Sequence, residues 1–201
     1  MLATRAVQRQ FREREAGKTY LAVLLGRPAQ DAFECSAPIA EHPHDRTRSV
    51  VVLAASKEGG AASGEEGGAA SGEEGVVQPK VPRPSHTRFE VVARGERATV
   101  CRVHPLTGRM HQIRVHAEAL GHPLAGDNQY GLEEQPTEPR CSRLLLHALS
   151  LRITHPATGE MVEFTAPPPA EFLREAAALG VPEDALAAAL ATPPATEAEL
   201  P

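Results

Sequence analysis

Ring nitrogens, guanidinium groups and a carboxamide crowd into one short stretch of the chain, residues 104–116 (HPLTGRMHQIRVH). Within it, Thr107 and Gly108 predict a tight turn, and residues 109–120 then place apolar side chains on one helical face. Gly121 and Pro123 are typical of a helix end. This is more functional chemistry than a packing element needs, so we expect a binding or catalytic site here.

The predicted start of this helix carries Arg109, His111 and Gln112. Free backbone N–H groups and the helix dipole attract an anion at such an end. A guanidinium adds fixed charge and suits a phosphate in particular. The pattern therefore indicates a phosphate-bearing ligand.

Two interpretations of Arg114 stay open from its position alone. It can hold a carboxylate in a bidentate pair. Alternatively, it simply pairs with Glu118 one turn later, a surface contact worth about 0.3–0.5 kcal/mol.

The histidines do not favour a metal site. His111 and His116 are five residues apart and fall on different sides of a helix, unlike a zinc-binding i,i+4 pair. His42 and His44 flank Pro43 in a polar turn, where solvated side chains are the more common outcome. Downstream, Asp127 and Tyr130 form either the wall of a cleft or a capped turn.

Several segments predict the elements that must position these residues. Residues 18–25 form an apolar run typical of a buried strand, and residues 49–53 predict a short strand. Alternating runs at 87–92 and 98–103 predict a hairpin that leads into His104, and 144–153 with 160–165 predict another strand pair. A short amphipathic helix is expected from about Thr4 to before Gly17. Strands and helices without regular alternation favour a mixed α+β domain with a mostly antiparallel sheet.

The remaining segments differ in composition. The octapeptide GGAASGEE at 59–66 is repeated at 67–74, which predicts a disordered insert over 59–82. Residues 170–179 and 182–191 are Ala-rich helix candidates, and 192–201 predict a loose tail. We expect a domain over 1–173 and a helical extension with its tail over 174–201.

The charge is unevenly distributed along the chain. The net charge is −5, yet residues 1–27 hold six basic side chains against two acidic ones, and residues 80–155 hold eleven against seven. A basic face for nucleic acid can therefore coexist with an acidic chain, although scattered solvated arginines would give the same count.

Three widely spaced cysteines predict neither a disulfide framework nor a zinc module. No apolar run is long enough for a membrane span, so a soluble intracellular protein is expected. The Arg-rich residues 1–14 also allow a transit peptide, although Glu13 is untypical of one. Cytoplasm and organelle are both open.

The ordered motifs resemble the RluA-type pseudouridine synthase family. The resemblance is carried by TGRMHQIRVH at 107–116, LGHPLAGD at 120–127, YG at 130–131, LLHAL at 145–149, THP at 154–156 and KTY at 18–20 with Gly26. It implies isomerisation of uridine to pseudouridine in structured RNA, by a nucleophilic Asp, without cofactor or metal.

The resemblance also implies residue roles. Arg114 would orient the nucleophilic Asp, Tyr20 would stack on the uracil, and Leu146 would form an apolar wall of the base pocket. We expect RNA contacts from Lys18, Arg109, His111 and Gln112. The structural part of the motif would comprise Thr107, Gly108, Gly126, Asp127 and Tyr130. A monomer that binds rRNA or tRNA is expected.

One part of the family pattern is missing. The nucleophile of the family lies in a His-Arg-Leu-Asp segment upstream of the Lys-x-Tyr strand, and these 201 residues contain no such segment. Asp45, in His44-Asp45-Arg46, lies downstream of Tyr20 and is not expected to replace it. We therefore expect Arg114 to lack its carboxylate and the chain to be inactive. Either Met1 is an internal start in a truncated sequence, or the chain is a non-catalytic RNA-binding remnant.

Overall fold

A six-stranded sheet organises the fold, and each neighbouring pair in it is antiparallel. The computed structural model describes residues 2–52 and 81–191. The strand order is β2-β5-β6-β1-β7-β8, and a separate two-stranded sheet pairs β3 with β4. The bounds are β1 Gly17–Leu25, β2 Ala32–Cys35, β3 Ile39–Glu41, β4 Ser49–Val51, β5 Thr87–Arg94, β6 Ala98–Pro105, β7 Leu146–Thr154 and β8 Met161–Thr165. The expected mixed α+β class is confirmed.

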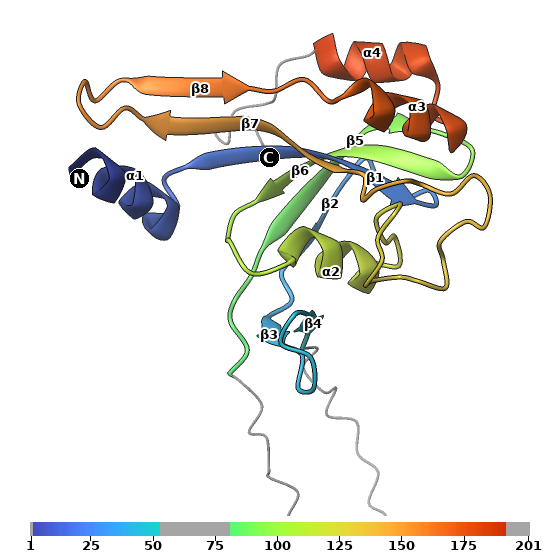
Figure 1. The fold of residues 1–201 in the computed structure, drawn as a ribbon, viewed down its shortest axis with the longest axis horizontal. Coiled ribbons are helices and arrows are strands. Elements are labelled where there is room, and N and C mark those ends of the chain that lie inside the picture. The colour runs from blue at the N-terminus through green and yellow to red at the C-terminus, as the bar shows by residue number, and fades with distance from the viewer. Residues whose placement is uncertain (1, 53–80, 192–201) are drawn as a thin grey trace, which may run out of the picture.

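Helices cover both faces of this sheet (Figure 1). α2 (Gln112–Ala119) lies on one face together with the β3–β4 pair, and it contacts β4, β5 and β6. α3 (Ala170–Ala178) and α4 (Glu183–Ala191) lie on the opposite side, while α1 (Leu2–Glu13) lies beside the β7–β8 hairpin.

The middle strand, β1, explains why its sequence is almost continuously apolar. Leu21, Val23 and Leu25 pack into the core beneath α3 and α4. Ala22 and Leu24 point the other way, into the core beneath α2. Side chains of a strand alternate between faces, so a strand covered on both faces needs apolar residues at every position. The buried strand expected over 18–25 is confirmed.

Other predicted elements are confirmed with small shifts. The hairpin expected at 87–103 is β5–β6, and the later pair is β7–β8. α1 begins before Thr4, which is therefore inside the helix, and Arg14 ends it in a left-handed conformation. The short strands β2 and β3 were not expected. Most of the predicted insert at 59–82 and the whole tail at 192–201 lie outside the described residues.

The C-terminal helices share the main core. Phe172, Ala176, Leu179 and Leu186 are buried against β1 and β6 residues. The domain boundary expected at 173 consequently falls inside α3, and residues 174–191 pack as part of the same unit.

A side chain continues the pairing of β7 beyond the beginning of β1. Past the Gly17–Arg152 pair, the Gln10 side chain donates to the Thr154 carbonyl oxygen and accepts from the Thr154 N–H, each at 2.7 Å. The amide of Gln10 thus replaces a strand backbone and fixes α1 against β7.

No helix in the described ranges is long and apolar enough to cross a membrane.

Candidate functional site

A tight turn after β6 delivers the motif residues to one place. Gln112 is buried at the start of α2, and its Oε1 accepts from the Thr107 hydroxyl at 2.6 Å and from the Arg109 N–H at 3.0 Å. Its Nε2 donates to the His86 carbonyl oxygen and to Thr87 Oγ1. Gln112 therefore ties the turn to β5 and sets the direction of residues 107–111.

An open pocket of about 340 Å³ lies at this turn, between α2 and the sheet. It brings together nine residues that the sequence singled out, from three separate segments. Its lining consists of Lys18, Tyr20, Pro105, Thr107, Gly108, Arg109, His111, Gln112, Ile113, Arg114, Leu144 and Leu146.

The sheet supplies the floor of the pocket. Tyr20 lies opposite Ala148, and Ala22 lies opposite Leu146, so Tyr20 and Leu146 come from adjacent strands. The Lys18 amine lies beside the turn, since a Cβ added at Gly108 would be 3.9 Å from Lys18 Nζ. An aromatic face, an apolar wall and a cationic rim are therefore adjacent.

Arg114 has a carboxylate partner, which confirms the bidentate interpretation of its position and corrects the expectation, drawn from the missing nucleophile, that it would have none. Its Nε donates to Asp127 Oδ2 at 2.7 Å and its Nη2 to Asp127 Oδ1 at 2.6 Å, a bidentate pair. The Asp127 side chain is fully buried, whereas the Arg114 side chain is 12% exposed and lines the pocket. The alternative pair with Glu118 is also wrong, because Glu118 Oε1 accepts from the Gly131 N–H.

The chain path after α2 explains this pairing. Residues 123–125 enter beside β1, where the Leu25 N–H donates to the Pro123 carbonyl oxygen and the Ala125 N–H to that of Val23. Gly126 follows with φ +72°, and an added Cβ would collide with the Arg143 carbonyl group. The next residue, Asp127, thereby reaches back under α2. Its Oδ1 also accepts from the N–H groups of residues 129 and 130.

The buried side chain of Tyr130 contacts two of the residues that line the pocket, Arg114 and His111. Its ring centroid lies 4.8 Å from Arg114 Cζ and 5.4 Å from Arg48 Cζ. The His111 ring meets it edge-on, with centroids 5.7 Å apart. Its hydroxyl accepts from the Ser49 N–H at 2.8 Å and lies 3.1 Å from His111 Nδ1.

The β3–β4 pair joins the site through residues that sequence reasoning missed. The Ser49 hydroxyl donates to the Met110 carbonyl oxygen at 2.8 Å, so Ser49 holds the turn next to His111. Arg48 Nη2 donates to the Gln129 carbonyl oxygen at 2.7 Å. Ser49 began a predicted strand, but no spacing in the sequence connects it to residues 110 or 130.

The electrostatics of the site follow from burial and pairing. The hydrogen bonds of Asp127 raise the pKa of Arg114, so the guanidinium stays charged. Desolvation, with a smaller contribution from Arg114, lowers the pKa of His111. Burial raises the pKa of the Tyr130 hydroxyl, so it stays protonated at neutral pH.

Two expectations about this region need correction. α2 begins at Gln112, and His111 is its N-cap in the left-handed conformation with φ +54°. Arg109 and His111 therefore precede the helix instead of forming its first turn. The carboxamide of Gln112 is engaged by protein groups on both sides, which argues for a positioning role rather than the direct RNA contact we expected.

His116 and Asp45 lie outside the pocket lining. His116 is fully buried, with Nδ1 2.8 Å from Thr87 Oγ1 and Nε2 3.0 Å from the Ala37 carbonyl oxygen. Asp45 Oδ1 accepts from the Thr47 N–H and hydroxyl in the turn between β3 and β4, and these bonds lower its pKa. Both residues are thus committed to local structure.

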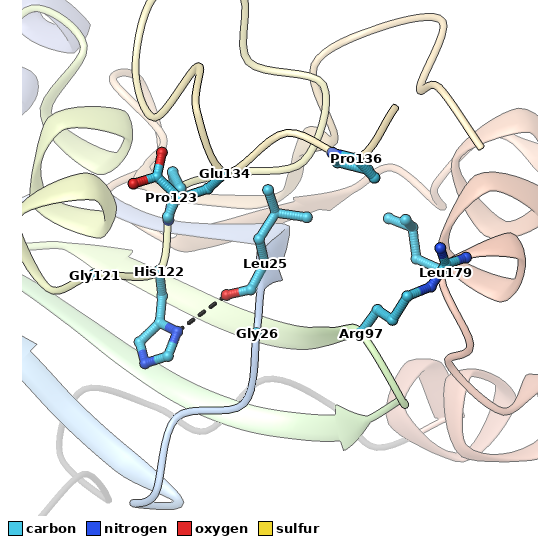
Figure 2. Close-up of a pocket in the computed structure, with 9 residues that line it drawn as sticks. All are labelled: Leu25, Gly26, Arg97, Gly121, His122, Pro123, Glu134, Pro136 and Leu179. Atoms are coloured by element: carbon cyan, nitrogen blue, oxygen red, sulfur yellow. Dashed lines mark hydrogen bonds between the residues drawn. The ribbon is translucent and has the colours of Figure 1, made fainter. Parts of the chain in front are cut away.

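A second pocket of about 350 Å³ opens between the end of β1 and α3, and it offers less chemistry (Figure 2). The His122 ring is bonded to the Leu25 carbonyl oxygen, shown by the dashed line in the figure. Arg97 donates to the carbonyl oxygens of Glu138 and Ala178. The polar groups of this second pocket are thus largely hydrogen-bonded within the protein, so the pocket at α2 is the stronger candidate for a functional site.

Comparison with known proteins agrees with this geometry. A sequence model described as RNA pseudouridylate synthase matches residues 2–119, more than half of the chain. The chain belongs to the RNA pseudouridylate synthase family. The match includes β1, the end of β6, the turn after it and the start of α2, which supply ten of the twelve residues that line the pocket, while Leu144 and Leu146 lie beyond it.

Individual members of the pseudouridylate synthase family cover most of the chain. It is 34% identical over 168 residues to the ribosomal large subunit pseudouridine synthase C of Pasteurella multocida, and 35% over 170 residues to that of Escherichia coli K12. These alignments cover 82% of this chain but 44% and 46% of the relatives, so the chain spans about half their length.

Solved structures of this family are also similar. Human RNA pseudouridylate synthase domain containing 1 superposes with a TM-score of 0.63 at 30% identity, over 96% of this chain and 72% of that one. Human RNA pseudouridylate synthase domain containing 4 gives the same TM-score at 21% identity and so shows the shared fold.

Proposed function

We propose that this chain binds a uridine of structured RNA in the pocket at α2, as the substrate-binding part of a pseudouridine synthase. The observation that carries the proposal is the convergence of Tyr20, Leu146 and Arg114 in one pocket. The family assignment supplies the reaction class. In that reaction the bond from N1 of the base to the ribose is broken, C5 is joined to the ribose with loss of its proton, and N1 gains a proton in the product.

Each wall of the pocket fits one part of a nucleotide. Tyr20 offers an aromatic face, and stacking on such a face contributes about 1–3 kcal/mol per base. Leu146 and Leu144 add apolar surface beside this ring. Lys18 and Arg109 are the cations suited to the phosphate backbone.

The chemical step needs a nucleophile that this pocket does not supply. Among the described residues that line it, none carries a carboxylate. The buried Asp127 is already bonded to Arg114 and to two backbone N–H groups, which leaves it poorly suited to attack a ribose. We therefore propose that these residues by themselves bind RNA without turning it over.

The second candidate function, an RNA-binding module without chemistry, is favoured by the same pair. Because Asp127 satisfies Arg114 inside the chain, the pocket is electrostatically complete and does not require another carboxylate to be stable. The two functions differ in whether a carboxylate from another polypeptide segment restores turnover.

Binding and turnover assays on uridine-containing hairpin RNA test the proposal. We expect measurable affinity, a loss of about 5- to 100-fold for Tyr20→Ala from lost stacking, and no pseudouridine by mass spectrometry. Met161→Ala, an exposed change on β8, is the control and should bind normally. Equal affinity for Tyr20→Ala would contradict the proposed pocket.

Turnover would also be informative. Pseudouridine formed by the unmodified chain, and lost in Asp45→Ala, would show that Asp45 acts as the nucleophile and would contradict our assignment. Turnover that persists in Asp45→Ala would point to another carboxylate and would contradict the binding-only role.

A further inference from the structure

The hydroxyl of Tyr130 determines which nitrogen of His111 carries the proton. Tyr130 is 1% exposed, and its oxygen accepts from the Ser49 N–H. The phenolic hydrogen then needs an acceptor, since a buried hydroxyl without one costs about 1–3 kcal/mol. Within the described residues, the only acceptor at hydrogen-bond distance is His111 Nδ1 at 3.1 Å.

This bond fixes the tautomer of the ring. If Nδ1 accepts from Tyr130, the proton of a neutral imidazole must be on Nε2. His111 is partly exposed and lines the pocket, and no described residue accepts from its Nε2. Nε2–H is thus an N–H donor available to a ligand.

The backbone at His111 is held in an uncommon conformation. A φ of +54° for a residue other than glycine costs on the order of 1 kcal/mol or more, and such residues cluster at functional sites. Ser49 holds the preceding Met110 carbonyl, and Tyr130 holds the ring itself. The strained turn is therefore fixed from two elements.

Asp127 orients the guanidinium group of Arg114, as Tyr130 orients the ring of His111. It occupies the Nε and Nη2 edge of the guanidinium, while no described residue accepts from Nη1. The pair as a whole has no net charge. A neutral His111 beside it gives this side of the pocket several N–H donors without net charge.

Donors without net charge suit a neutral acceptor. Phosphate is better bound by the cationic rim of Lys18 and Arg109, whereas the carbonyl oxygens of uracil accept hydrogen bonds without carrying charge. We propose that Tyr130 is a positioning residue that presents His111 as a neutral Nε2–H donor to a carbonyl oxygen of the bound uracil, next to Arg114 held by Asp127. This inference rests on the proposed function for its ligand.

The charge state of His111 is consistent with this role. The groups that face it are Arg114 from α2 and Asp127 and Tyr130 from the following loop, and Arg48 lies over the Tyr130 ring with Cζ 5.4 Å from its centroid. Burial and Arg114 lower the pKa of His111, which favours the neutral ring at pH 7.

Nitrogen-15 NMR of the histidine rings in the full chain tests the tautomer directly. At pH 7 we expect His111, identified by the signal missing in His111→Gln, to show the Nε2–H pattern. In Tyr130→Phe this signal should shift toward a mixture of tautomers, while Met161→Ala, an exposed change on β8 away from the pocket lining, should leave it unchanged. A protonated or Nδ1–H His111 in the unmodified chain would overturn the inference.

Uridine 5′-monophosphate tests the ligand. Its addition should shift the His111 Nε2 signal, and Tyr130→Phe should weaken its binding about 5- to 30-fold, with the buried His116 signal unchanged as a check on folding. If the nucleotide binds but the His111 signal does not move, the donor role is wrong and the pocket stands. If no uridine nucleotide or RNA binds at all, the proposed function fails while the tautomer result still stands.

Discussion

Among single residues, two buried histidines make the stability of this fold sensitive to acid. His104 on β6 is 5% exposed, and burial, with smaller contributions from Arg102 and Arg88, lowers its pKa to about 4. His116 is also fully buried with a lowered pKa. Such rings are neutral when folded but become protonated more easily in the unfolded chain.

His104 therefore predicts a loss of stability on acidification. A histidine whose folded pKa lies below its unfolded value of about 6.5 stabilises the protein fully above that value. This stability is lost as the pH falls from about 6.5 towards 4. Urea unfolding should show a decrease of roughly 1–2 kcal/mol from His104 between pH 7 and pH 5.

The pH dependence, rather than the absolute stability, is the measurement that matters here. His104→Gln should flatten the decrease and leave the part due to His116, whereas the exposed His44→Gln should not change it. An unaltered decrease in His104→Gln would show that the ring is not neutral and buried in the folded protein.

At the level of elements, the turn after α2 decides whether Arg114 meets Asp127. Gly126 has φ +72° and contacts the Arg143 backbone, while Gly159 in the β7–β8 turn has φ +75° with nothing near its Cβ position. The two glycines share a conformation but differ in their surroundings, which makes them a matched pair.

We expect Gly126→Ala to be much more damaging than Gly159→Ala. The left-handed conformation costs alanine about 1–2 kcal/mol at either site, and only Gly126→Ala adds a backbone collision. Thermal unfolding should show the difference, and RNA affinity should fall only in Gly126→Ala because Asp127 is displaced. Equal effects of the two variants would contradict this close packing.

The sequence predicted the elements that obey simple periodicity. The β5–β6 hairpin, β1 and the C-terminal helices follow from alternation, apolar runs and helix formers. β2 and β3 were missed because AFEC and IAE are short and carry no run of β-branched residues like the one that revealed β4, and they pair with β5 and β4. The start of α2 was misplaced because a left-handed His111 has no propensity signal.

The site was predictable in its residues but not in its contacts. Arg114 was expected to lack a carboxylate because the family's nucleophilic segment is missing, and Asp127 could be either a cleft wall or part of a capped turn. The pairing depends on residues 123–125 entering beside β1, a tertiary event without a local signal. The Tyr130 contact with Ser49 joins segments that are 81 residues apart, so only the folded chain reveals it.

For the whole molecule, the response of RNA binding to salt depends on a contrast in charge: the chain as a whole is negative, whereas the rim of the pocket is positive. The chain carries −5 overall, while the pocket rim carries Lys18 and Arg109. Only the local cations release counterions on contact with phosphate, so attraction should be short-ranged and strongly screened.

RNA affinity should consequently fall with salt, and Arg109→Ala should reduce the slope of log K against log salt by about 0.7. Filter binding from low to physiological salt measures this slope. Arg152→Ala is the control, because Arg152 pairs with Glu163 away from the pocket lining and should leave the slope unchanged. A slope unaffected by Arg109→Ala would remove Arg109 from the phosphate contacts.

The central position of β1 sets the order in which this chain can fold. β1 comes early in the sequence, but its neighbours β6 and β7 are synthesised much later, whereas the β5–β6 and β7–β8 hairpins close locally. Local hairpins form in microseconds, and distant pairings must wait for the closure of long loops. The repeat-bearing residues 53–80 fall between β4 and β5 in the sequence, so they add to the separation of each distant pair, β1–β6, β1–β7 and β2–β5. Because the entropic cost of closing a chain segment rises by only about 0.6 kcal/mol for each doubling of its length, we expect the gain or loss of one octapeptide between β4 and β5 to change the stability of the sheet little.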